Sequence, residues 1–195
     1  MNISTAGRSL PVSEEDYLAG EANAKLKHEY VDGLIYAMVG GEYVHSLIGA
    51  NVIGELHAQL KGKPCRALTS DTKLRVSTQS RTRFYYPAAM VVCGQHLLAG
   101  VFQDQPTILV EVLSRSTRRT DEGEKKEAYL AIDSLAAYVL FEQDCVAAIA
   151  YRRQGETFER QTFSGLEASI ELPSIDCRLG LAAVYANLDF SGQRK

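Results

Sequence analysis

Residues 83–92 read RFYYPAAMVV, and residues 106–131 read PTILVEVLSRSTRRTDEGEKKEAYLA. The apolar runs in these two stretches predict strands over residues 83–93 and 107–113. Strands this apolar are typically buried on both faces of a sheet. A loop containing glycine and proline joins the two strands, and a helix over residues 121–132 follows the second. The sequence therefore predicts two central strands followed at once by a helix.

The chain on either side contains further local signals. Ser13 followed by three acids predicts a helix start, because a serine N-cap and acids in the first turn both stabilise a helix. Asp32-Gly33 is a typical hairpin turn, and Asp121 with Glu124 predicts a capping box. Before residue 83 we expect a lead-in over residues 1–12, a helix over 14–21, a hairpin over 27–38, a helix over 42–60 and strands over 65–69 and 73–77. After residue 132 we expect strands over 136–141, 146–152 and 158–163, a short edge strand over 170–172 and a helix over 179–185.

This order of elements predicts a mixed central sheet flanked by helices, in the α/β or α+β class. The chain has 195 residues, of which 46% are hydrophobic and 23% charged, as in ordinary globular proteins. We therefore expect a single domain over residues 1–195, with its core at about 12–190. No apolar run approaches the ~20 residues of a membrane span. The N-terminus lacks the apolar segment of a signal peptide, so we expect a cytoplasmic protein.

The four cysteines are spread singly along the chain, with no spacing typical of a metal site. They are Cys65, Cys93, Cys145 and Cys177. This pattern favours reduced core residues of a cytosolic protein over zinc ligands or disulfides.

Glu111 interrupts the most apolar stretch of the chain, in ILVEVL. A buried carboxylate is costly unless it is paired or bound to a metal. Lys125 lies on the helix that follows this strand. An acid in a strand with a lysine close by is the minimal arrangement of a metal-dependent phosphodiesterase. The alternative is a buried ion pair with a structural role alone.

Five segments carry a resemblance to a known family: KHEYVDGLIYAM, SDTKLRV, YYP, LVEVLSRSTRRTDEGEKKEAY and LPSIDCRLGLAAVY. They resemble the Uma-two family of restriction-endonuclease-like proteins, in the PD-(D/E)XK nuclease superfamily. The resemblance extends over residues 12–190. It implies the restriction-endonuclease-like fold and magnesium-dependent cleavage of nucleic acid.

The resemblance assigns catalytic roles to Glu29, Glu111 and Lys125, with Glu111 as the metal ligand. The family's aspartate after proline falls at Ala88, so this acid is missing. Magnesium prefers hard oxygen ligands, and a cation is needed to polarise the phosphoryl oxygen and to hold a nucleophilic water. We therefore expect weak or absent magnesium binding and impaired cleavage. A degenerate domain that binds nucleic acid or a protein partner without cleaving is the alternative. A third alternative is an accessory role beside a toxin or a transposon.

Other residues near these positions have simpler interpretations. Glu29 adjoins a hairpin, and simple exposure is its alternative role. Tyr129 lies one turn after Lys125 and favours core packing. Asp71 could replace the missing acid, but a turn role is favoured. His28 and His45 are isolated and are not expected to be ligands.

Nucleic-acid binding requires a local basic patch, because the net charge of the chain is −3. Arg115, Arg118 and Arg119 follow Glu111 and could contact the phosphates of DNA. They are interleaved with acids, so a salt-bridged surface is the alternative. Members of the family are often dimeric, and the apolar C-terminal strands predict a surface for a homodimer.

Overall fold

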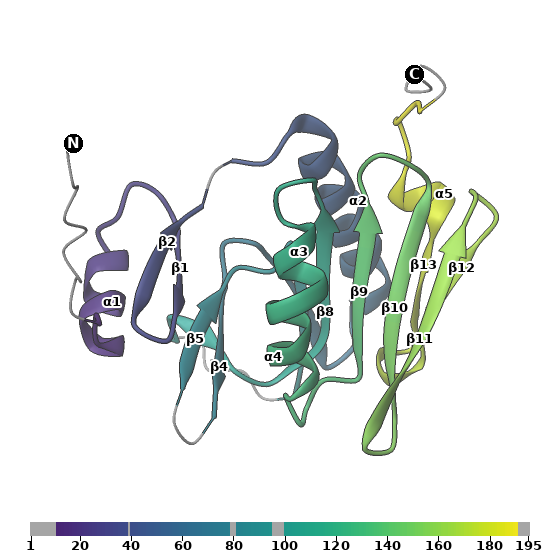
Figure 1. The fold of residues 1–195 in the computed structure, drawn as a ribbon. Helices are drawn as coiled ribbons and strands as arrows, with labels where there is room; N and C mark the ends of the chain where they lie inside the picture. Colours follow the sequence, from purple (N-terminus) through teal and green to yellow (C-terminus); the bar gives the residue numbers. More distant parts are fainter. Residues whose placement is uncertain (1–10, 39, 79–80, 95–99, 191–195) are drawn as a thin grey trace.

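The central element is a six-stranded mixed sheet in the order β11-β10-β9-β8-β6-β3. The computed structural model describes residues 11–38, 40–78, 81–94 and 100–190 (Figure 1). In this sheet β8 and β9 are parallel, and the other neighbours are antiparallel. Its strands are β3 (Cys65–Thr69), β6 (Ala89–Cys93), β8 (Pro106–Leu113), β9 (Ala137–Glu142), β10 (Ala147–Gln154) and β11 (Thr157–Ser164). The predicted mixed sheet flanked by helices is confirmed.

Helices cover both faces of this sheet, which explains why β8 is apolar except at Thr107 and Glu111. Figure 1 shows α2 (Tyr43–Leu60) on one side of β8 and β9, and α3 (Arg118–Thr120) and α4 (Lys126–Leu130) on the other. Side chains alternate along a strand. Ile108, Val110 and Val112 accordingly lie in the core cluster that contains α2 residues, whereas Leu109 and Leu113 lie in the cluster that contains Tyr129. By the same alternation, Glu111 is on the α4 side.

A second sheet lies beside the first, in the order β2-β1-β5-β4-β7. Its strands are β1 (His28–Val31), β2 (Leu34–Ala37), β4 (Lys73–Ser77), β5 (Thr82–Tyr85) and β7 (Phe102–Gln103). The helix α1 (Glu14–Glu21) packs on it through Tyr17, which stacks on Tyr30 and contacts Phe84. The hydroxyl of Ser13 accepts a hydrogen bond from the Asp16 amide, so the predicted N-cap is confirmed.

The predicted strand over residues 83–93 is wrong in one respect. It divides at Tyr86-Pro87-Ala88 into β5 and β6, which belong to different sheets. Proline has no N–H to donate to a strand ladder and disfavours the interior of a sheet. Pro87 therefore marks the crossing from one sheet to the other.

Two predicted helices also differ from the structure. The helix expected over residues 121–132 begins at Arg118 and contains a π-helical turn, η1 (Asp121–Lys125), without a side-chain cap. The final helix is only α5 (Leu181–Val184), because the preceding residues form β13 (Cys177–Gly180). β13 pairs with β12 (Ser169–Leu172), in a separate two-stranded sheet. Residues 1–10 of the predicted lead-in lie outside the described residues.

The expectation of four reduced core cysteines is also wrong. Cys65 and Cys93 form a disulfide, while Cys145 is free and exposed and Cys177 is free and buried. The two bonded residues are direct partners in the register of β3 and β6, which their separation of 28 residues in sequence does not reveal.

Among the described helices, none has the length and apolar character needed to cross a membrane.

The β1–β2 hairpin has the turn that its sequence predicts. Asp32 and Gly33 both have positive φ, at 50° and 96°, as a two-residue primed turn requires. The segment before α1 lies against this turn, since the Val12 amide donates to the Gly33 carbonyl at 2.9 Å. A Cβ atom at Gly33 would approach the Cβ of Pro11 to 2.6 Å.

We predict that Gly33→Ala destabilises the protein more than Gly155→Ala. Gly155 also has a positive φ, of 61°, in the turn of the β10–β11 hairpin, but a Cβ there meets nothing within 4 Å. Both changes introduce backbone strain of about 1 kcal/mol or more. Only Gly33→Ala adds the clash with Pro11. Urea unfolding measures both changes, and equal losses in free energy of unfolding would contradict the prediction.

Candidate active site

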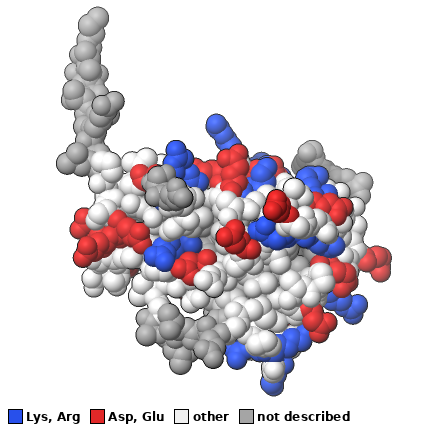
Figure 2. Space-filling view, turned by 90° about the horizontal axis from the view of Figure 1, so that it is seen from below, with Lys and Arg blue, Asp and Glu red and all other residues white. Residues whose placement is uncertain are grey.

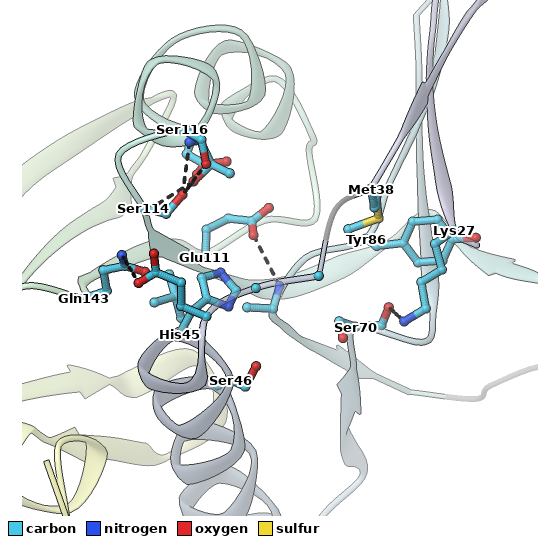
Figure 3. A pocket seen from close by; sticks show the side chains of 18 of the residues that line it. Lys27, Met38, His45, Ser46, Ser70, Tyr86, Glu111, Ser114, Ser116 and Gln143 are labelled. Carbon is cyan, nitrogen blue, oxygen red and sulfur yellow. Dashed lines mark hydrogen bonds between the residues drawn. The ribbon is translucent and has the colours of Figure 1, made fainter. Parts of the chain in front are cut away.

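A cavity of about 1520 Å³ opens between α2, the end of β8 and the loop after β2. Glu111, Asp121 and Lys125 line it from the β8 side, and His45 and Ser46 line it from the first turn of α2. Figure 3 shows the side chain of Glu111 on the same side of the cavity as His45, with Lys27 and Tyr86 at the opposite end. The cavity therefore connects a buried acid to solvent.

Glu111 is buried, and three groups donate hydrogen bonds to its carboxylate. The ammonium of Lys125 and the hydroxyl of Tyr129 donate to Oε1 at 3.3 and 3.0 Å. The amide of Ala88 donates to Oε2 at 3.3 Å, drawn as a dashed line in Figure 3. These contacts fix the direction of the carboxylate. Tyr129 therefore does more than the core packing that its sequence position favours.

Lys125 is held among three carboxylates from three elements. Its Nζ atom lies 2.8 Å from Glu29 on β1, 3.3 Å from Glu111 on β8 and 3.5 Å from Asp121 on the same π-helical turn. Burial alone lowers the pKa of Lys125, but Glu111, Glu29 and Asp121 more than offset this effect, and the net pKa is raised. Lys125 is therefore a buried, permanently charged ammonium.

Burial raises the pKa of Glu111 from its ordinary 4.5 to about 7. The charge of Lys125 opposes this shift, whereas Asp121 and Glu29 add to it. Such perturbed acids in a cleft are typical of functional sites. Burial therefore makes the carboxyl of Glu111 easier to protonate than a solvent-exposed one.

The structure thus brings Glu29, Glu111 and Lys125 into contact, with Ala88 lining the same cavity. The interpretation of Glu29 as a merely exposed residue does not fit its ion pair with the buried lysine. Asp71 is exposed and pairs with Lys27 away from Glu111, which fits the turn role. His28 pairs with Glu21, and His45 lines the cavity.

Comparison with known proteins relates the chain to one family model and to solved structures. A family model described as Uma2, "Putative restriction endonuclease", matches residues 14–183. The chain belongs to the Uma2 family. A solved structure with a similar fold is that of a "putative nuclease belonging to DUF820" from Anabaena variabilis ATCC 29413. It is 17% identical, with a TM-score of 0.70, and the match covers 90% of this chain and 98% of that one. No curated protein matches.

The Uma2 comparison supports the family and fold that the sequence motifs imply, and the geometry adds one residue that they do not. Asp121 was expected to cap the helix, but it is 2% exposed and lies within the π-helical turn. The signal in the sequence is its spacing of four residues from Lys125, which places both side chains on one side of a helical turn. The capping pattern alone does not show whether Asp121 caps the helix or pairs with Lys125.

The three arginines of this Uma2 chain lie in different environments. Arg118 is engaged by Glu142 and by Glu122, so the salt-bridged alternative describes it. Arg115 lines the cavity, and its side chain is 92% exposed, with Asp144 at 3.8 Å. Arg119 is exposed. Figure 2 shows basic and acidic side chains interspersed on the face it presents, without one broad basic area.

The oxygen donors in the cavity fit a hard cation. Within the described ranges, no group of three or more His, Cys, Asp or Glu side chains has the arrangement of a metal site. Magnesium does not need such a group, because it keeps several waters and takes one or two carboxylates together with substrate phosphates. Glu111, whose side chain lines the cavity, could be such a carboxylate.

We predict that, as the pH rises from 5 to 8 in chelator, the parent protein loses free energy of unfolding relative to Glu111→Gln. Between pH 4.5 and about 7 the folded protein binds more protons than the unfolded chain at Glu111, so stability is lost as the pH rises. The loss due to Glu111 is on the order of 3 kcal/mol. Glu111→Gln removes this contribution and leaves the other titrating groups in place. Equal pH dependence in the two proteins, measured by urea unfolding, would disprove the shift.

Proposed function

We propose that this chain is a magnesium-dependent endonuclease that hydrolyses phosphodiester bonds in DNA within the cavity beside Glu111. The observation that carries the proposal is the buried ammonium of Lys125, in contact with Glu111 and Glu29 at the wall of an open cavity. Family membership and fold support it. Since a carboxylate and an ammonium face the same cavity, the site can bind a cation and stabilise an anion side by side.

Each residue has a distinct role in this proposal. Glu111 holds the cation, which when bound polarises the scissile phosphate and acidifies a water. Lys125 orients the attacking water and stabilises the negative charge that develops on the phosphate. Glu29 positions Lys125 from the neighbouring sheet. Arg115 at the rim is the one of the three arginines best placed to contact the DNA backbone, because it is both exposed and part of the cavity wall.

Ala88 favours a second candidate function, binding of nucleic acid or of a protein partner without cleavage. Ala88 presents only a methyl group where the family pattern has an acid, so this position offers the cation no ligand. A titration with magnesium separates the two functions, because only the nuclease requires the cation.

We predict that Lys125→Met lowers plasmid cleavage in magnesium by at least about a hundredfold, the usual effect of losing one transition-state stabiliser. Lys126→Met is the matched control, because it removes the same charge one residue later, where the ammonium lies over the ring of Tyr151. The control should retain cleavage within about threefold. Equal activity of the parent and Lys125→Met would refute the assignment. Absence of cleavage in the parent, with DNA binding retained, would favour the second candidate.

We also propose a homodimer, through β2 rather than the C-terminal strands. The apolar residues of β12 and β13 are buried in the core, as Ile170, Leu172 and Leu179 show. β2 is the outer strand of its sheet, and its apolar residues Leu34, Ile35 and Tyr36 are all exposed. An exposed apolar edge is a template for pairing with a second copy.

We predict that Ile35→Lys converts the dimer to a monomer in light scattering at micromolar concentration. A charge at the centre of an apolar edge opposes strand pairing. Leu166→Lys is the control, since Leu166 is exposed to a similar degree outside β2. A monomeric parent protein would end this proposal.

A further inference from the structure

Asp121 has an unsatisfied carboxylate oxygen at the wall of the cavity. The residue is 2% exposed, and its Oδ1 atom accepts no hydrogen bond from any residue in the described ranges. The ammonium of Lys125 lies 3.5 Å away, beyond the usual hydrogen-bond distance. Leaving a buried carboxylate oxygen without a donor is costly. A cation in the cavity would satisfy this atom.

Asp121 and Glu111 are neighbours of the same ammonium. Both carboxylates contact the same ammonium, at 3.5 and 3.3 Å, so the contacting oxygens are at most about 7 Å apart. Both residues line the cavity, whereas Glu29, the nearest carboxylate to Lys125, does not. Glu111 and Asp121 therefore face the cavity, whereas Glu29 contacts Lys125 from outside it.

The net charge of this cluster also favours a cation. Three carboxylates surround a single ammonium, and like charges in a buried site raise each other's energy. Arg118, three residues before Asp121, is engaged by Glu142 and Glu122. The single charge of Lys125 therefore does not balance the three carboxylates around it.

We propose that Asp121 supplies a second cation-ligating carboxylate beside Glu111, in place of the side chain that Ala88 lacks. This inference rests on the proposed function, since it concerns the same magnesium. The acid comes from the π-helical turn instead of from the strand, and the hydroxyl of Tyr138 anchors that turn by donating to the Asp121 carbonyl at 3.1 Å. A purely structural ion pair with Lys125 is the competing role.

The test measures magnesium binding directly, by calorimetry with magnesium alone, and by the magnesium-dependent rise in melting temperature. The variants are Asp121→Asn, Ala88→Asp in the Asp121→Asn background, and Glu127→Gln. Glu127 is an exposed acid on α4, so its change controls for the loss of one negative charge.

We expect Asp121→Asn to bind magnesium at least about tenfold more weakly than the parent and to lose most of the magnesium-dependent rise in melting temperature. Glu127→Gln should bind like the parent. Adding Ala88→Asp to Asp121→Asn should restore the affinity to within about threefold of the parent, because it returns a carboxylate to the cation from the neighbouring strand.

Three outcomes would overturn the inference. Parental affinity in Asp121→Asn would show that Asp121 is not a ligand, and the proposed function would stand. Weak binding that Ala88→Asp does not restore, together with a lower melting temperature in chelator, would identify the structural role. A parent that neither binds magnesium nor cleaves DNA would remove the proposed function itself, and this inference with it.

Discussion

The structure depends on one buried ammonium group held among carboxylates. Burying a charge is tolerable only when it is paired and hydrogen-bonded. The Lys125 ammonium meets this condition through Glu29 on one sheet, Glu111 on the other and Asp121 on its own turn. Removing Lys125 would leave three carboxylates without a compensating charge. The same contacts therefore serve both the packing of the core and the polarity of the cavity.

The sequence predicted the central part of this arrangement for physical reasons. An acid within an apolar strand must have a partner, and the helix immediately after β8 carries the lysine that becomes that partner. The alternation along β8 also determines which face Glu111 occupies. Glu29 was different, because nothing local to its hairpin indicates a contact with Lys125. Only the resemblance to the family indicated it.

The remaining features depend on contacts between distant segments. The π-helical turn is anchored by Tyr138 on β9, which is a contact with a distant segment. The local pattern at Asp121 gives no sign of this contact and predicts a helix cap instead. Cys65 and Cys93 meet only because β3 and β6 are neighbours in a particular register. The division of residues 83–93 could have been predicted, because Pro87 is a clear local signal against a continuous strand.

The ion-paired cluster also joins two sheets that share no strand pairing within the described residues. Glu29 belongs to the five-stranded sheet and Glu111 to the six-stranded sheet, and the chain crosses between them at Pro87. A small sliding of one sheet against the other would lengthen the contact between Glu29 and Lys125 while leaving every strand ladder intact. The geometry of the cavity therefore depends on how the two sheets pack against each other, as well as on the strand ladders within each sheet.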